Sequence, residues 1–379
     1  MLKELQRLRG IACIMVLLQH ICLVTPIDFF QNKVPTIFQY GSCGVYLFFV
    51  ISGFVIAFTQ KNKLENCCKS DDFVERLYSS GNVLKSFFVR RAFRLIPALL
   101  GVLLIVIFFH SIFTNDRVAI LGAIKTLFDI ISCNYADCVN TNVLYEAFHL
   151  QGTGPLWTLS IEVFFYLTFP IIFLLLKNNT SRVKFFLISG AISWFCFRWI
   201  FDHVLHLSVL NYYNIFINLD GLLLGTFLGI TYDRKKADTA ENHWIWSCLS
   251  LILIFGMWCP QNFSAVQDEV RWCNTAVFFS VWLVYLAVYN KGVLNIPIIK
   301  NILEYLGDRS YSFYIYQMFL AFSINWLSNS NYLSIKTNSL EFGWLYIIIL
   351  LIITEISYNV IEKPMRKLGA TFSQKYIIH

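Results

Sequence analysis

Two residues of the first apolar segment, RLRGIACIMVLLQH, have the types and spacing to do chemistry together. Arg9 and His20 are eleven residues apart, and a helix of that length separates them by about 16 Å along its axis. Arg9 is then expected at one boundary of the apolar layer, and His20 beyond its middle. A neutral imidazole can act as a general base. A structural histidine, hydrogen-bonded to a neighbouring helix, is the alternative.

A carboxylate stands near one end of another apolar segment, GPLWTLSIEVFFYL. Glu162 follows Trp157 by five residues, which is about 7 Å along a helix axis. If this helix crosses a membrane in the opposite direction to the first, Glu162 and His20 lie at similar depths. A carboxylate beside an imidazole can orient the ring and increase its basicity. Glu162 and His20 are therefore the candidate catalytic pair.

A pair of arginines, Arg91 and Arg94, begins a third apolar segment, FFVRRAFRLIP. One helical turn separates them, so they share a face. The preceding segment, 61–94, holds eight basic and four acidic residues. Guanidinium groups match the geometry of phosphate oxygens, which makes both arginines candidates for binding a phosphorylated ligand. Anchoring to lipid head groups is the alternative.

Polar residues at the ends of other apolar segments are candidates for lining a site. Asp220, in NLDGLLLG, is costly in lipid unless it pairs with Arg198 or a sugar hydroxyl. Ser310 and Tyr311 begin the aromatic segment SYSFYIYQ. Glu362 lies in IEKP at the end of the last apolar segment, where we expect a structural role.

The elements that position these residues must be helices in a membrane. Hydrophobic residues make up 57% of the 379-residue chain and charged residues only 14%, whereas soluble domains carry about 25% charged residues. A span needs about 20 mostly apolar residues. Ten segments meet this requirement, near 8–24, 42–60, 95–114, 156–176, 183–201, 214–231, 244–260, 272–289, 310–327 and 342–361. The sequence predicts an all-α, polytopic membrane protein.

The basic residues predict the orientation of these spans. With the N-terminus inside, 24 Lys and Arg fall on the cytoplasmic side and 6 on the other, as positive-inside topology requires. Both termini are then cytoplasmic, and the first span is uncleaved. The segment 61–94 is expected to be a basic cytoplasmic loop, and 115–155 an outer loop with an interfacial helix at 117–131. The net charge of +7 is explained by this topology, and no nucleic-acid partner is expected.

The eleven cysteines form no metal-binding pattern. Five of them lie in apolar runs, where thiols behave as small hydrophobic groups, namely Cys13, Cys22, Cys43, Cys196 and Cys248. Cys133 and Cys138 share the expected outer loop, and a disulfide between them is left open. We expect no metal site.

Six motifs in chain order resemble those of the acyltransferase-3 family of membrane O-acyltransferases, the type that O-acetylates bacterial polysaccharides. The resemblance covers nearly the whole chain, which is expected to be a single domain, 1–379. The sequence departs from the family pattern at Val163, where a second Glu is common, and at Gln317, where His is common. The matching motifs are Arg9 with His20, GVYLFFVISGF at 44–54, Arg91 with Arg94, LWTLSIE at 156–162, the Gly-x-x-Ser-Tyr block at 307–311 and EKP at 362–364.

This resemblance implies a multi-pass protein of the bacterial inner membrane. It would transfer an acyl group, most simply acetyl from cytoplasmic acetyl-CoA, to a hydroxyl of a glycan or lipid-linked glycan such as lipopolysaccharide O-antigen. His20 would deprotonate the hydroxyl or carry the acyl group, with Glu162 orienting it. The remaining roles are CoA binding by Arg9, Arg91 and Arg94, and substrate lining by Asp220, Ser310 and Tyr311. A transporter or flippase for a lipid-linked glycan is the alternative, since intramembrane His, Glu and Arg also serve carriers.

Overall fold

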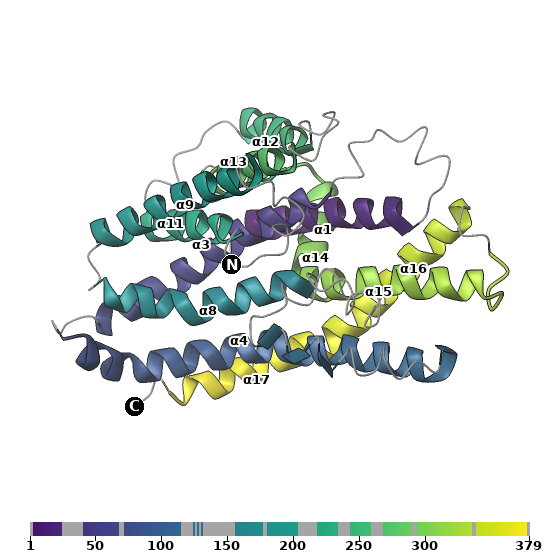
Figure 1. The fold of residues 1–379 in the computed structure, drawn as a ribbon, viewed down its shortest axis with the longest axis horizontal. Helices are drawn as coiled ribbons and strands as arrows, with labels where there is room; N and C mark the ends of the chain where they lie inside the picture. The colour runs from purple at the N-terminus through teal and green to yellow at the C-terminus, as the bar shows by residue number, and fades with distance from the viewer. Residues whose placement is uncertain are drawn as a thin grey trace.

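The structure is a computed structural model, and every regular element it describes is a helix (Figure 1). The all-α prediction is confirmed. The described residues are 3–24, 41–67, 72–114, parts of 124–131, 156–176, 180–203, 218–233, 243–258, 268–289, 294–335 and 339–376.

A helix lies on each of the ten segments selected by hydropathy. Among the described residues, four helices are long and apolar enough to cross a membrane, Cys43–Asn66, Phe73–Phe113, Trp157–Leu175 and Leu340–Gln374, and shorter apolar helices accompany them. The chain is therefore a multi-pass membrane protein. The ten helices are α1 (Lys3–Val24), α3 (Cys43–Cys67), α4 (Phe73–Phe109), α8 (Trp157–Leu175), α9 (Thr180–His203), α11 (Asp220–Thr231), α12 (His243–Trp258), α13 (Asp268–Tyr289), α15 (Ser310–Asn329) and α16 (Leu340–Ser357).

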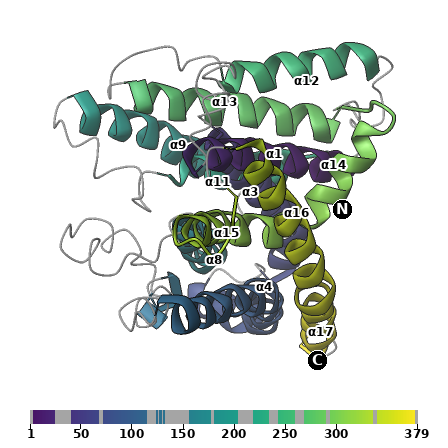
Figure 2. The ribbon, with the colours of Figure 1, turned by 90° about the vertical axis from the view of Figure 1, so that its right-hand side faces the viewer.

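Helix α3 lies inside the bundle, and α4 and α16 lie at its periphery. In the apolar window of α3, 78% of the residues are buried, against 33% in α4 and 22% in the helix that contains α16. The exposed side chains of α4 include Leu104 and Phe108, and those of α16 include Ile352. Large apolar side chains on an outer face are suited to contact with lipid. Figure 2 shows α4 at the lower edge of the bundle and α16 leading down to α17 at the lower right.

The expected loop 61–94 is mostly helical, which corrects the prediction. Helix α3 extends to Cys67, and α4 begins at Phe73. The Asp72 carboxylate caps α4 by accepting a hydrogen bond from the Glu75 amide at 3.2 Å. With 37 residues, α4 is about 55 Å long, well beyond the roughly 30 Å of a bilayer core. The arginines at 90–94 therefore lie on a continuous helix.

The C-terminal segment is also helical beyond the last predicted span. Helix α16 passes through a π-helix, η7 (Tyr358–Glu362), into α17 (Lys363–Gln374), which lies along α4 (Figure 1). A second π-helix, η2 (His110–Thr114), ends α4. Such π segments often occur near functional sites. The described parts of 124–131 are helical, whereas 117–123 and the pair Cys133–Cys138 lie outside the described residues.

The short helix α14 (Ile299–Asp308) fixes the start of α15 against α1. Two glycines allow the backbones of α1 and α14 to touch: a Cβ at Gly10 would overlap the Leu303 carbonyl, and a Cβ at Gly307 would overlap the Gln6 carbonyl. Small residues permit this kind of close approach between membrane helices. An ion pair adds to the contact, in which Arg7 Nε donates to Glu304 at 2.8 Å.

Candidate active site

A small cavity of about 50 Å³, open on one side, lies between five helices. It brings together residues that are far apart in the sequence, from α1, α3, α4, α8 and α15. Five of the predicted site residues line it, namely Arg9, Arg94, Glu162, Ser310 and Tyr311. The other lining residues are Val45, Phe48, Phe49, Ser52, Thr158, Leu159 and Tyr314. The wall thus combines two cations and one carboxylate with apolar and aromatic side chains.

The Glu162 carboxylate is held by two hydroxyl groups. Ser52 Oγ donates to one carboxylate oxygen at 2.7 Å, and Tyr166 OH donates to the other at 2.8 Å. Tyr166 lies one turn beyond Glu162 on the same face of α8, while Ser52 comes from the buried helix α3. Hydrogen bonds to a charged acceptor are among the stronger ones in proteins. This arrangement fixes the carboxylate in the cavity wall.

The arginines gather around this carboxylate. Arg9 is 6% exposed, and Arg9, Arg91 and Arg94 all interact electrostatically with Glu162. Arg91 does not line the cavity; its guanidinium lies over the rings of Tyr166 at 4.9 Å and Phe87 at 5.4 Å. Cation–π contacts of this kind hold a guanidinium in place. Arg91 therefore supports the cavity wall, and Arg9 and Arg94 present charge to the cavity itself.

The first turns of α15 form the opposite wall. Tyr311 OH donates to the Leu95 carbonyl of α4 at 2.7 Å, and Thr158 Oγ1 of α8 donates to Tyr314 OH at 3.2 Å. These bonds tie α15 to the two helices that carry Arg94 and Glu162. Ser310 lies where α15 meets α1, with Cys13 Sγ 3.8 Å from its carbonyl oxygen.

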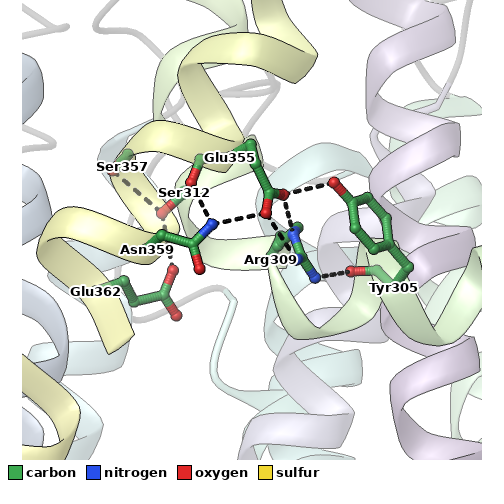
Figure 3. A network of polar contacts seen from close by, with 7 residues as sticks. All are labelled: Tyr305, Arg309, Ser312, Glu355, Ser357, Asn359 and Glu362. Atoms are coloured by element: carbon green, nitrogen blue, oxygen red, sulfur yellow. Dashed lines mark hydrogen bonds and ion pairs between the residues drawn. The ribbon is translucent and has the colours of Figure 1, made fainter. Parts of the chain in front are cut away.

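A polar network fixes the junction of α14, α15 and α16 behind this wall (Figure 3). Arg309 donates to both oxygens of Glu355, at 2.5 and 3.0 Å, and Tyr305 OH donates to the same carboxylate at 2.5 Å. The Arg309 guanidinium also lies 3.7 Å from the centre of the Tyr305 ring. In the same view Ser312 Oγ donates to the buried Glu362 at 2.8 Å. Glu362 thus anchors η7 to α15, which agrees with the structural role expected for it.

Three predicted site residues are not among those that line the cavity: Arg91, described above, and also His20 and Asp220. His20 is 7% exposed, and no described contact joins it to Glu162. Asp220 is fully buried in the first turn of α11, where its Oδ1 accepts from the Gly221 amide at 2.9 Å. The described contacts thus include no pairing of His20 with Glu162, and Asp220 lies in the first turn of α11.

Tyr166, Ser52 and Arg366 are among the residues in and around the site that sequence reasoning missed. Tyr166 follows Glu162 by four residues, so its contact could have been found from the helical period. Ser52 is in a motif of the resemblance, but its partner on another helix cannot be read from spacing. Arg366 of α17 interacts electrostatically with Arg9 and donates to Glu362 at 3.4 Å. Its position could not be predicted, because the sequence did not show that the C-terminal segment continues as a helix.

Comparison with known proteins identifies the family of this membrane domain. A family model described as an acyltransferase domain, that of the acyltransferase-3 family, matches residues 2–358. The chain belongs to the acyltransferase-3 family. It is similar to the O-acetyltransferase OatA of Staphylococcus aureus strains NCTC 8325, COL and MRSA252, with 26% identity over 342 residues.

The match to OatA covers 87% of this chain and 53% of OatA, so the chain spans about half the length of these curated relatives. No solved structure matches the chain. Within this acyltransferase-3 domain, the cavity is placed where Arg9, Arg94 and Glu162, from three of the family-like motifs, come together.

Proposed function

We propose that this acyltransferase-3 protein transfers an acetyl group from cytoplasmic acetyl-CoA to a hydroxyl of a cell-surface glycan, such as lipopolysaccharide O-antigen, at the bacterial inner membrane. The observation that carries the proposal is the cavity lined by Arg9, Arg94, Glu162, Ser310 and Tyr311. Its cations suit the phosphates of CoA. Its apolar wall suits the less polar arm that carries the thioester.

The proposed topology has ten spans with both termini cytoplasmic. The division of basic residues, 24 to 6, supports it, as does a helix on each predicted span. In this orientation Arg9, Arg94 and the start of α15 lie toward the cytoplasm, where the donor is found. Arg91 contributes positive charge from beside the cavity.

The chemical step needs a base for the acceptor hydroxyl, and we assign it to His20. The imidazole takes the hydroxyl proton while the hydroxyl oxygen bonds to the thioester carbonyl carbon. The carbon–sulfur bond then breaks, and the proton passes from the imidazole to the CoA thiolate. His20 is about 16 Å beyond Arg9 along α1, so the long arm of CoA spans from its phosphates toward the base. Asp220 lies outside the cavity and is given no role.

The test is acetyl transfer by the purified protein in detergent. Radiolabelled acetyl-CoA and the cell's own glycan should give labelled glycan, heavier by about 42 Da for each acetyl group. Transfer without sealed vesicles cannot come from a transporter. We expect His20→Ala to lower kcat by about 10²-fold or more. His110→Ala, at a histidine outside the site in η2, is the matched control and should keep wild-type activity.

A His20→Ala protein that stays within about threefold of wild type, at equal amounts of folded protein, would overturn the assignment of the base. A wild-type protein that labels no glycan, although its family fold is intact, would overturn the proposed reaction itself.

A further inference from the structure

Three buried side-chain atoms meet at the contact between α1 and α15 without being hydrogen-bonded. In the part of the chain that the structure describes, His20 Nδ1 and both amide atoms of Gln317 have no hydrogen-bond partner. His20 is 7% exposed and Gln317 is fully buried. The Gln317 side chain lies close enough to the His20 ring to interact with it. Buried polar atoms are nearly always paired, so two neighbouring exceptions require a common explanation.

The two residues continue the helix faces that line the cavity. On α1, Arg9 and His20 are eleven residues apart, close to three full turns, so both point to one side. On α15, Ser310, Tyr314 and Gln317 follow the spacing of a single helical face. Arg9, Ser310 and Tyr314 line the cavity. The pair His20–Gln317 therefore lies farther along the same seam between α1 and α15.

Helix α15 is fixed at this level by a neighbouring helix. Tyr346 OH of α16 donates to the backbone carbonyl of Gln317 at 3.0 Å, so the backbone of Gln317 is held at this level of the seam. The Gln317 side chain is a neighbour of the His20 ring from this fixed backbone position.

We infer that Gln317 is the positioning residue for His20. Its amide oxygen accepts a hydrogen bond from Nδ1–H, which fixes the ring and selects the tautomer with a lone pair on Nε2. Nδ1 is a buried nitrogen without a partner, which is why we assign this bond to it and assign to Nε2 the uptake of the acceptor hydroxyl's proton. The third group of the site is then an amide from α15, in the position that the sequence suggested for Glu162. This inference rests on the proposed function.

The test compares substitutions of Gln317 in the acetyl-transfer assay. Gln317→Met keeps the volume and removes the acceptor, and we expect kcat to fall about 10- to 100-fold while KM for acetyl-CoA stays within about twofold. Gln317→Glu restores an acceptor and should recover most of the lost kcat. Gln60→Met is the matched control, because Gln60 is also a buried glutamine with an unpartnered amide oxygen, and it should keep wild-type kcat.

A merely structural role predicts the opposite order, since an apolar side chain is tolerated inside a membrane bundle better than a carboxylate. Activity of Gln317→Met equal to or above that of Gln317→Glu would therefore overturn the inference. In a His20→Ala background, Gln317→Met should cause no further loss, because its effect passes through the imidazole; a full additional loss would also overturn it.

If Gln317→Met does not fold, Gln317→Asn is the second test. Asn keeps the amide, but its shorter side chain holds the amide farther from His20. A wild-type kcat in this variant would overturn the inference. Failure of the proposed function gives a different result. In that case the wild-type protein labels no glycan at all, whereas failure of the inference alone leaves wild type active, His20→Ala inactive and the Gln317 variants unaffected.

Discussion

Replacing Glu162 by Gln tests whether this carboxylate acts on the arginines or on the histidine. In the wild-type protein, the hydroxyls of Tyr166 and Ser52 bind the carboxylate at 2.8 and 2.7 Å. The substitution preserves both hydrogen bonds, because the new amide oxygen can accept from Tyr166 and the new amide nitrogen can donate to Ser52. What disappears is one negative charge next to Arg9 and Arg94. The cavity then becomes more positive where we place the phosphates of CoA.

The size of the effect follows from Coulomb's law. Two unit charges 4 Å apart interact by about 4 kcal/mol at an effective dielectric constant of 20. Among the described contacts, Glu162 makes hydrogen bonds to hydroxyls and no direct ion pair, so its interaction with other charges is weaker than this. We therefore take about 1–2 kcal/mol for the lost repulsion between the carboxylate and the donor phosphates. This corresponds to an affinity for CoA that is higher by about 5- to 30-fold.

The assay is calorimetric titration of CoA into purified wild-type, Glu162→Gln and Tyr166→Phe proteins, with kcat and KM measured on the same samples. Tyr166→Phe is the control: it removes one hydrogen bond but keeps the charge and the ring under Arg91, so its affinity for CoA should equal that of wild type. If Glu162→Gln lowers kcat but leaves the affinity for CoA unchanged, the electrostatic reasoning is refuted and a direct role toward His20 is favoured.

Three further substitutions test other parts of the structure. Arg94→Ala removes a cavity cation and should raise KM for acetyl-CoA by about tenfold or more, with kcat much less affected. Gly307→Ala places a methyl group on the Gln6 carbonyl and should lower the melting temperature, whereas Gly81→Ala, with no atom within 4 Å of the new methyl, should not. Glu355→Gln weakens the Arg309 ion pair, and because the carboxylate is 39% exposed the free energy of unfolding should fall by less than about 1 kcal/mol, as measured by denaturant titration.

The apolar segments could be predicted from the sequence because a membrane span is a continuous apolar run that composition alone reveals. The helices outside these runs were missed for the same reason. Helix α14, the first half of α4 and α17 are amphipathic, with apolar residues at helical spacing among charged ones, as in KPMRKLGATFSQ. Such segments have a low average hydropathy and were taken for loops or tails. These segments are stabilised as helices by packing against other helices, and this packing cannot be read from the sequence of one segment alone.

The residue types of the site could be predicted, but their pairing could not. Arg9, Arg94 and Glu162 were selected as ionisable groups in apolar segments, and the cavity brings these three together. The pairing of Glu162 with His20 was inferred from depth along two helix axes. The structure instead places Glu162 at the level of Arg9 and Arg94, about three turns of α1 from His20, because how far α8 is shifted along its axis relative to α1 cannot be read from either segment alone.

The seam between α1 and α15 explains why two polar clusters occur in place of the single cluster that the sequence suggested. Arg9 and Ser310 line the cavity at one end of this seam, with Ser310 beside Cys13, about one turn past Arg9. His20 and Gln317 lie about two turns beyond Cys13 and Ser310. Because each helix is rigid, the distance between the levels is set by the helical rise and does not depend on side-chain adjustment. A donor with its phosphates at the arginines can therefore bring its reactive carbon to the histidine only through an extended arm. For the proposed reaction, the spacing between Arg9 and His20 therefore suits a long thioester donor. The carboxylate of Glu162 lies at the arginine level, where its charge would weaken the binding of the donor's phosphates.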